Sequence, residues 1–331
     1  MSASASAATA VPAVAWVESP LQLINAIEFA AATGTPLVVE PRAGVLQLDE
    51  TIEAVRPALP AGVTVARPVA SADREDFRSA AHQVVGDVFS GQFRLLVARW
   101  GVRRLTIVDD GSATVHFAAA LDGAPFVRMA QVESRAMQIL GALVKRRILT
   151  AARRGRVALF TAYEGESTVG GLSGRGIRII GNSYSWLRSL SAIGAAPASP
   201  RVVLGSALVT DRQIGLDNYL GWLRGLAAGG SISYLPHRRE DAAQRAAVAA
   251  LDNVIVEAGT LPAELALGSS QTLERVDTLP SSAVVTLRAI LPADVPIRVS
   301  PVPASWWLPG SDPSIRRAFD QLARKDDTHV D

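Results

Sequence analysis

The sequence predicts a protein of two open α/β domains, each built on a mostly parallel sheet, with a cleft between them. The chain has 331 residues, more than one ordinary core holds and enough for two domains of about 150 residues each. Short apolar runs alternate with stretches of helical periodicity along the whole chain. The alternation begins again after an uncharged, Pro-containing segment at 194–200, which is typical of a linker.

The first half begins with an Ala/Ser-rich stretch, for which we expect disorder over 1–12. Ser19 and Pro20 are typical of the cap and the first turn of a helix, here 21–32, and Gly34 is typical of its end. Strands are predicted in chain order at 14–17, 37–39, 63–66, 105–108, 157–160 and 177–180. Helical periodicity covers 77–100, with a break near Gly91, and 133–156.

The second half repeats this alternation. Strands are predicted at 202–204, 232–235, 254–256, 276–280 and 297–299, and helices at 215–226, 241–251 and 283–290. Asp312 and Pro313 are typical of the start of a final helix that runs to about residue 323. We therefore expect one α/β domain over 13–195, a second over 196–310, and a C-terminal helix and tail over 311–331.

Composition excludes several functions. The 33 basic and 31 acidic residues are too balanced for a nucleic-acid binder. The absence of cysteine excludes disulfides, thiolate metal sites and a cysteine nucleophile. There is no Walker loop, no GxGxxG after the first strand and no histidine pair at metal-ligand spacing, so we expect no metal or bound cofactor. With no secretory signal pattern and no apolar run of 18 residues, we expect a cytoplasmic protein.

Polar side chains follow three of the predicted strands, where open α/β sheets bind their ligands. They form the groups Asp109-Asp110-Gly111, Pro236-His237 and Ser281-Ser282. Together a carboxylate pair, a histidine and a serine pair suggest an enzyme that activates a hydroxyl and stabilises a departing phosphate.

The pair Asp109 and Asp110 has two interpretations. It is either an ordinary strand-to-helix turn, with Gly111 supplying an unusual backbone angle, or a catalytic pair. In the second case one carboxylate is the general base, while the other holds the loop by accepting backbone N–H bonds. Partial burial and the neighbouring charge would raise the pKa of such a base. Asp211 is a reserve candidate for this base.

The donor-side candidates suit a phosphate and a ribose. His237 is followed by Arg238 and another arginine, and such a group binds a phosphoryl oxygen, with the histidine as a cation or a proton donor. Ser281 and Ser282 cap the helix 283–290, and a helix N-terminus also binds phosphate. Glu257, at another strand end, suits a hydrogen bond to a ribose.

The segment 145–156 carries six basic residues and no acidic one. A solvated helix end explains this pattern. The alternatives are peripheral contact with an anionic membrane surface or with an anionic acceptor glycan.

Four segments resemble those of bacterial sialyltransferases of glycosyltransferase family 52 and the related bacterial polysialyltransferases. Residues 18–23 (ESPLQL) are similar to the Ser/Thr-Pro-Leu-Gln opening of these families, and 109–111 (DDG) to their paired-acid-glycine motif. Residues 234–240 (YLPHRRE) resemble the segment around their essential histidine, and 280–282 (PSS) their serine motif. The order is as expected, but Arg238 stands where proline often follows the histidine.

The resemblance implies a GT-B fold with two Rossmann-like domains facing a central cleft. It implies metal-independent transfer, with inversion, of sialic acid or a related nonulosonate from a CMP-sugar to a glycan or glycolipid in polysaccharide biosynthesis. Asp109 or Asp110 would be the base. The donor side would comprise Pro236, His237, Arg238, Glu257, Ser281 and Ser282, and the acceptor side Ser19, Pro20, Gln22, Gly111 and Asp211.

Two other functions stay open on the sequence. One is a GT-B transferase that uses another nucleotide sugar, such as a UDP-hexose. The other is a catalytically silent protein that binds an anionic sugar or nucleotide.

Overall fold

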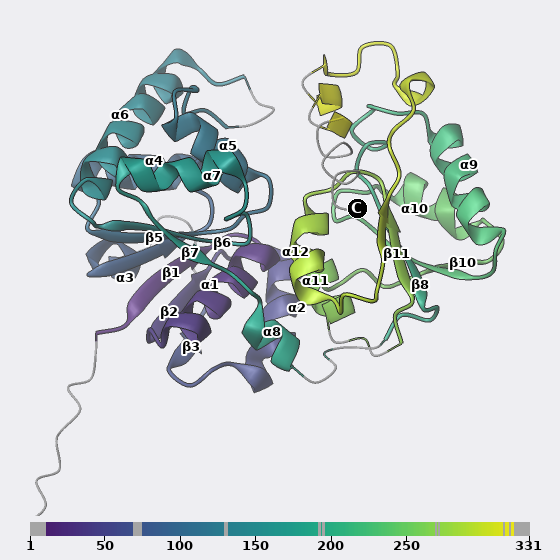
Figure 1. Ribbon diagram of the computed structural model, residues 1–331, viewed down its shortest axis with the longest axis horizontal. Coiled ribbons are helices and arrows are strands. Elements are labelled where there is room, and N and C mark those ends of the chain that lie inside the picture. Colours follow the sequence, from purple (N-terminus) through teal and green to yellow (C-terminus); the bar gives the residue numbers. More distant parts are fainter. Residues whose placement is uncertain are drawn as a thin grey trace, which may run out of the picture. The chain divides into compact units, whose positions relative to one another are not determined.

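The computed structural model describes residues 11–68, 75–128, 132–190, 193, 196–268, 270, 272–313, 315–317 and 319–320. The chain forms two compact units, Met1–Trp186 and Leu187–Asp331, here called unit 1 and unit 2. Each unit carries one parallel sheet flanked by helices (Figure 1). The division lies within helix α8 (Ser185–Ser189). The expected linker 194–200 follows it, but residues 194 and 195 lie outside the described residues.

Unit 1 carries a seven-stranded parallel sheet in the order β3-β2-β1-β4-β5-β6-β7. The strands are β1 (Ala13–Val17), β2 (Leu37–Pro41), β3 (Val63–Val65), β4 (His82–Val85), β5 (Arg104–Val108), β6 (Val157–Thr161) and β7 (Arg178–Gly181). The strand order reverses between β1 and β4, where Ala15 pairs with Val39 of β2 on one side and with Val84 of β4 on the other. Such a switch point is where open α/β sheets bind ligands, at the carboxyl ends of the strands.

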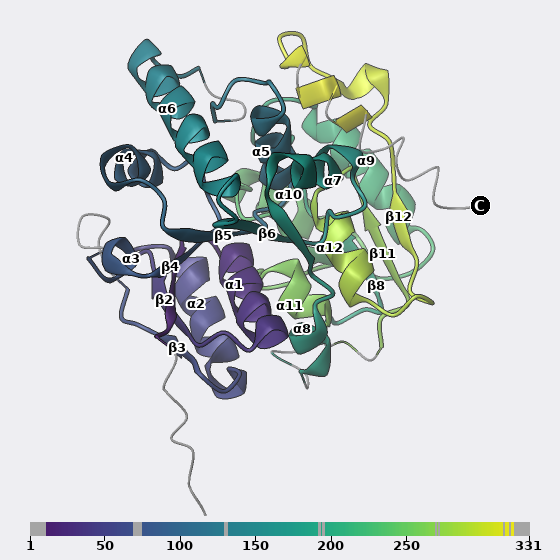
Figure 2. The ribbon, with the colours of Figure 1, turned by 60° about the vertical axis from the view of Figure 1, so that its left-hand side comes forward.

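Helices cover both faces of this sheet, which explains why its inner strands are almost wholly buried. The helical elements are α1 (Pro20–Thr33), α2 (Leu46–Val55), η1 (Arg56–Ala58), α3 (Glu75–Ser79), α4 (Gly91–Trp100), α5 (Ala113–Leu121), α6 (Arg135–Ala152), α7 (Ser167–Gly170) and η2 (Gly171–Arg175). Figures 1 and 2 show α1 and α2 on one face and α4, α5, α6 and α7 on the other. Helix α1 begins at the predicted cap, Ser19, and is followed by Gly34 at φ +63°.

Strand β4 corrects the helical interpretation of 77–100, because a strand lies between two separate helices there. Two of its four buried residues are polar. His82 Nε2 lies 2.9 Å from Thr106 Oγ1, and Gln83 Nε2 donates to the carbonyl of Phe77 at 3.0 Å. These polar side chains interrupt the apolar run that marks a buried strand, so hydrophobic periodicity missed it.

Unit 2 carries a five-stranded parallel sheet in the order β10-β9-β8-β11-β12. Its elements are β8 (Arg201–Leu204), α9 (Leu216–Ala227), β9 (Ile232–Leu235), α10 (Ala242–Ala249), β10 (Val254–Val256), α11 (Ala263–Gly268), β11 (Arg275–Thr278), α12 (Ala283–Ile290), β12 (Ile297–Val299) and η3 (Ala304–Trp306). Every predicted strand of this half is present, whereas α11 was not predicted. One apolar cluster packs α9 and α10 on the sheet, and another packs α11 and α12.

The predicted final helix is present at 313, 315–317 and 319–320, and its remainder lies outside the described residues. In unit 2 the strand order again reverses beside β8, so β9 and β11 lie on either side of this strand. The turns after these three strands therefore meet at one switch point.

Candidate functional site

The carboxylate of Asp110 lies at the N-terminus of α1. Its Oδ2 accepts a hydrogen bond from Gln22 Nε2 at 3.0 Å, and its Oδ1 accepts one from Ser19 Oγ at 3.4 Å. Ser19 also caps α1 by accepting the backbone N–H of Gln22 at 3.3 Å, while Gln22 Oε1 accepts the N–H of Glu18 at 2.8 Å. Capping thus holds the hydroxyl and the amide against the carboxylate. Three predicted site residues are brought together here, with Pro20 in the first turn between them.

Gly86, directly after β4, makes this contact possible. Strand β4 lies between β1 and β5, so Gln22 must cross the end of β4 to reach Asp110. A Cβ on Gly86 would lie 2.3 Å from Gln22 Cγ, so the Gln22 side chain would have to move. The sequence does not point to Gly86, because the polar residues of β4 hide the strand that it follows; at a recognised strand end this glycine would be the signal.

Asp109, unlike its neighbour, is fully buried and holds the turn together. Its Oδ1 accepts a hydrogen bond from Thr114 Oγ1 at 2.8 Å, and its Oδ2 accepts the N–H of Ala162 at 2.7 Å. Burial raises the pKa of Asp109 to about 6; hydrogen bonds from Thr161, Ala162 and Thr114 oppose the rise, and the charge of Asp110 adds to it. Both oxygens are engaged inside the protein. Asp110 is partly exposed, so it is the member of the pair that a substrate hydroxyl can reach.

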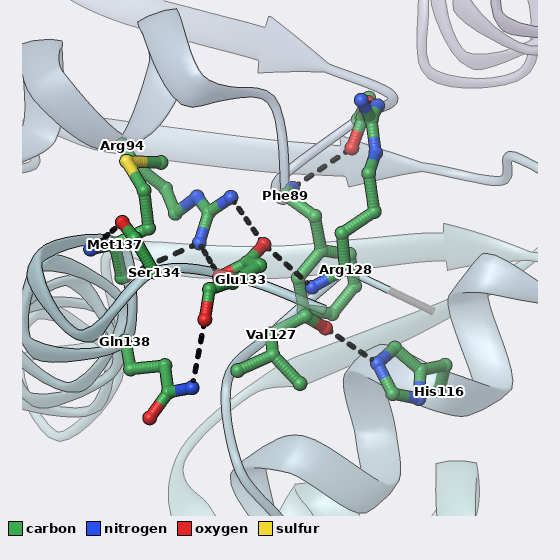
Figure 3. A network of polar contacts seen from close by, with 10 residues as sticks. Phe89, Arg94, His116, Val127, Arg128, Glu133, Ser134, Met137 and Gln138 are labelled. Atoms are coloured by element: carbon green, nitrogen blue, oxygen red, sulfur yellow. Dashed lines mark hydrogen bonds and ion pairs between the residues drawn. The ribbon is translucent and has the colours of Figure 1, made fainter. Parts of the chain in front are cut away.

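A buried ion pair ties α4 and α6 to the same edge of the sheet (Figure 3). Arg94 donates to both carboxylate oxygens of Glu133, at 2.7 and 2.8 Å, and both side chains are less than a tenth exposed. Glu133 also accepts the N–H of Arg128 at 2.9 Å, and the Arg128 guanidinium pairs with Asp87, the residue after Gly86. Two charged pairs therefore anchor the start of α6 beside the turn that follows β4.

His237 lies in the turn after β9. Its Nδ1 accepts the N–H of Arg239 at 3.2 Å, which leaves Nε2 to carry the proton of the neutral ring. Burial, and after it the charges of Arg239 and Arg238, lower the pKa of His237 to about 4. The imidazole is therefore neutral at pH 7 and offers Nε2–H as a hydrogen-bond donor. Both predicted roles, cation and proton donor, require a protonated ring, so the neutral ring acts as a hydrogen-bond donor instead.

A buried network beneath this turn sets its shape. Glu240 Oε1 accepts the N–H of His237 at 2.7 Å and the hydroxyl of Tyr234 at 2.8 Å. The Tyr234 hydroxyl lies 2.9 Å from that of Tyr219. Burial raises the pKa of Glu240, and its Oε2 is buried without a hydrogen-bond partner among the described residues, an arrangement that favours the protonated form.

Gly205, which follows β8, is packed against this network. A Cβ at this position would lie 2.2 Å from Glu240 Oε1 and 2.6 Å from the backbone nitrogen of His237. Neither Gly205 nor Glu240 was singled out in the sequence. Glu240 lies three residues after His237 in the segment 234–240, and this short spacing is the sequence signal that could have indicated it.

The other donor-side residues fall into two groups. Ser281 Oγ accepts the N–H of Ala283 at the start of α12, at 3.2 Å, and Ser282 occupies the N-cap position. These serines follow β11, and Pro236 and His237 follow β9, so the two groups lie on either side of β8.

Glu257 and Asp211 are engaged elsewhere in unit 2. Glu257 Oε1 accepts the N–H of Ala198 at 2.8 Å. Asp211 pairs with Arg239 at 2.8 Å, so this expected acceptor-side residue contacts the turn of His237, next to the exposed Arg238.

The turn of Asp110 includes Gly111 at φ +62°, as the predicted backbone angle requires. Within the described ranges, no three or more His, Asp or Glu side chains are grouped to hold a metal ion. No helix of the described residues is long and apolar enough to cross a bilayer.

No protein-family model and no curated protein sequence matches this chain. The solved structures similar to it include two sialyltransferases. An α/β-galactoside α-2,3-sialyltransferase from Photobacterium phosphoreum has a TM-score of 0.53 at 10% identity, over 95% of each chain. A 2,6-sialyltransferase from Vibrionaceae Photobacterium sp. JT-ISH-224, in a complex with CMP and lactose, has a TM-score of 0.52 at 10% identity, over 95% of this chain and 75% of that one. The likeness shows the fold, which is that of GT-B glycosyltransferases, with two parallel-sheet α/β domains.

Proposed function

We propose that this chain is an inverting glycosyltransferase that moves sialic acid or a related nonulosonate from a CMP-sugar to a hydroxyl of a glycan or glycolipid. The observation that carries the proposal is the pair at 109 and 110, in which a buried carboxylate supports a partly exposed one at the N-terminus of a helix. The fold shared with two sialyltransferases supports it, and one of these binds CMP and lactose. The absence of cysteine fits a reducing compartment, and the proposal places the enzyme in the cytoplasm.

Asp110 is the general base of the proposed reaction. Hydrogen bonds from Ser19 and Gln22 orient its carboxylate. The acceptor hydroxyl gives its proton to Asp110 while its oxygen bonds to the anomeric carbon of the donor. The bond from that carbon to the CMP phosphate breaks on the opposite face, and its electron pair stays with the phosphate oxygen, so the configuration is inverted.

Unit 2 stabilises the phosphate as it leaves. The neutral His237 ring offers Nε2–H, and the start of α12 offers backbone N–H groups and the hydroxyl of Ser281. These donors act where negative charge develops on the phosphate, which is the role a divalent metal plays in other transferases. The mechanism predicts full activity in the presence of a chelator.

Isothermal titration of the full chain with CMP, with UDP as the matched control and EDTA in the buffer, tests the donor. We expect binding of CMP that is lost in His237→Ala. Binding of UDP alone would indicate a UDP-hexose donor. Binding of neither nucleotide would indicate that the protein uses no nucleotide donor.

Turnover is tested separately, because a silent protein could still bind CMP. The chain is incubated with CMP-sialic acid and a panel of glycan and glycolipid acceptors, and the release of CMP is followed with and without each acceptor. Acceptor-dependent release is expected. Binding of CMP without release for any acceptor would point to the catalytically silent alternative.

A further inference from the structure

Two helices of unit 1, α4 and α6, carry several exposed apolar side chains. Helices α4 and α6 lie on the same side of the sheet and pack against each other (Figures 1 and 2). Among the described residues, nine large apolar side chains are exposed, and four of them belong to this helix pair. They are Leu95 at 60%, Trp100 at 54%, Ile139 at 72% and Leu143 at 39%. Single exposed leucines are ordinary, but such a gathering on two packed helices indicates an interaction surface, here called the α4/α6 face.

The same surface carries unbalanced positive charge. Residues 135–156 include seven basic residues and no acidic one, and α4 also has no acidic residue. The exposed cations are Arg99, Arg135, Arg146, Arg153, Arg154 and Arg156. Within the described part of the chain, none of these six forms an ion pair with a carboxylate.

Helical spacing places the two kinds of side chain on one stripe of α6. Arg135, Ile139 and Leu143 follow one another at intervals of four residues, and Arg146 and Arg153 continue the stripe. The opposite side of the helix, with Gly141, Val144 and Ile148, is buried against the protein. The apolar pair is therefore flanked by arginines at both ends.

The structure also changes the interpretation of the basic segment 145–156. Lys145 donates to the carbonyl of Ala124 at 3.2 Å, and Arg147 donates to that of Val97 at 2.8 Å. These two cations hold α6 in place and are only partly exposed. The charged surface is thus centred on the outward stripe of α6, which begins before the basic segment and includes its apolar side chains.

We propose that the α4/α6 face docks on the surface of an anionic lipid bilayer. Arginines attract anionic headgroups, and the apolar side chains enter the boundary between headgroups and acyl chains. Trp100 is of the residue type that favours this boundary. A soluble polyanion would satisfy the arginines but would leave Ile139 and Leu143 in water, so charge and apolar exposure together favour a lipid surface. The proposal does not depend on the donor.

Vesicle co-sedimentation of the full chain tests this docking. Vesicles of phosphatidylcholine alone are compared with vesicles of equal parts phosphatidylcholine and phosphatidylglycerol. We expect binding to the anionic vesicles only, weakened by salt because the attraction is screened. Each basic side chain near the surface contributes about fivefold to binding. The double variant Arg146→Glu with Arg153→Glu should therefore bind at least about tenfold more weakly.

The apolar contribution is measured with Ile139→Ser combined with Leu143→Ser, for which a loss of at least about tenfold is expected. The matched control is Leu46→Ser on α2, a 73% exposed leucine on the other face of the sheet, and it should bind as the wild type does. Unchanged melting temperatures verify the fold, and unchanged CMP titrations separate docking from the proposed function. Binding that survives the apolar change, or an absence of binding to anionic vesicles at low salt, would overturn the proposal.

Discussion

Asp109 and Asp110 are neighbours in the chain but differ in the property that decides their chemistry, which is access to a substrate. Asp109 is 0% exposed, and its two oxygens accept hydrogen bonds from Thr114 and from the N–H of Ala162. Asp110 is partly exposed and is oriented by Ser19 and Gln22. The turn therefore separates a structural carboxylate from one available for proton transfer.

Replacing the two aspartates should have different consequences. Asp110→Asn removes the proposed base, so turnover should fall by at least about 100-fold with little change in the melting temperature. Asp109→Asn puts an amide N–H₂ where buried donors need an acceptor, which should cost about 1–3 kcal/mol of stability. Steady-state kinetics and thermal unfolding of both variants distinguish these effects. Equal and mild losses of turnover would show that neither aspartate is the base.

The buried carboxyl of Asp109 should also make stability depend on pH. Burial raises its pKa from 3.8 to about 6, so the folded state favours the protonated form. Its stabilising contribution is then fully present below the unfolded value and is lost as the pH rises through about 6. Between about pH 4 and pH 7 we expect the free energy of unfolding of the wild type to fall by ~2 kcal/mol relative to that of Asp109→Asn. Urea unfolding of both proteins across this range measures the difference, and parallel curves would contradict it.

His237 should bind phosphate as a neutral donor, because its pKa of about 4 lies well below neutrality. His237→Ala should weaken CMP binding at least about tenfold, and His237→Gln, which keeps an N–H near the position of Nε2, should lose less. The ratio of wild-type to His237→Gln affinity should stay constant from about pH 6 to pH 8, since the ionisation of CMP affects both proteins alike. Titration calorimetry gives the ratio. A ratio that falls as pH rises through about 6.5 would instead indicate a cationic ring.

At the scale of elements, each unit has a glycine directly after a strand beside its switch point. Because this glycine has no Cβ, it leaves room for a side chain that positions a residue of the candidate site. In unit 1, Gly86 follows β4 and Gln22 passes over it to Asp110; in unit 2, Gly205 follows β8 and Glu240 passes over it to hold the turn of His237. The geometry of both candidate sites thus depends on the ends of β4 and β8, although the glycines there have no side chain that could act on a substrate.

Gly205→Ala tests whether the turn of His237 needs this glycine. The new Cβ would have to displace Glu240 or the backbone of His237, so we expect CMP binding to weaken at least about tenfold and stability to fall by about 1–3 kcal/mol. The matched control is Gly221→Ala in α9, where nothing lies within 4 Å of the added Cβ. That change should leave binding intact and stabilise the chain by about 0.4–1 kcal/mol. Calorimetry and thermal unfolding report both; CMP binding at wild-type strength in Gly205→Ala would show that the turn tolerates the shift.

The elements themselves were largely predictable, with instructive exceptions. Short apolar runs identified every strand of unit 1 except β4 and all five strands of unit 2, because strands of a covered parallel sheet are rich in apolar residues. Strand β4 was missed since its polar residues His82 and Gln83 find partners only in the folded sheet. Helix α11 is a six-residue element, too short to show helical periodicity.

At the scale of the whole molecule, the proposed function divides its tasks between the units. In this proposal unit 1 supplies the base and unit 2 holds the nucleotide. Hydrogen exchange with CMP tests the division, with UDP at the same concentration as the control. Slower exchange is expected at 205–206, 236–240 and 281–283, by up to about 100-fold when CMP is present at about 100 times its Kd. Protection confined to 19–22 and 109–111 would instead place the nucleotide in unit 1.

The sequence by itself determined the two α/β units, most of their strands and the short list of polar residues at strand ends, because burial and capping leave local patterns in the chain. It left open which of Asp109 and Asp110 could act as a base, since two adjacent residues differ in access only once a neighbouring strand covers one of them. The tertiary structure decided which of the two is exposed. It also brought Gly86 under Gln22 and Gly205 under Glu240, contacts that join strands far apart in sequence and therefore leave no local pattern.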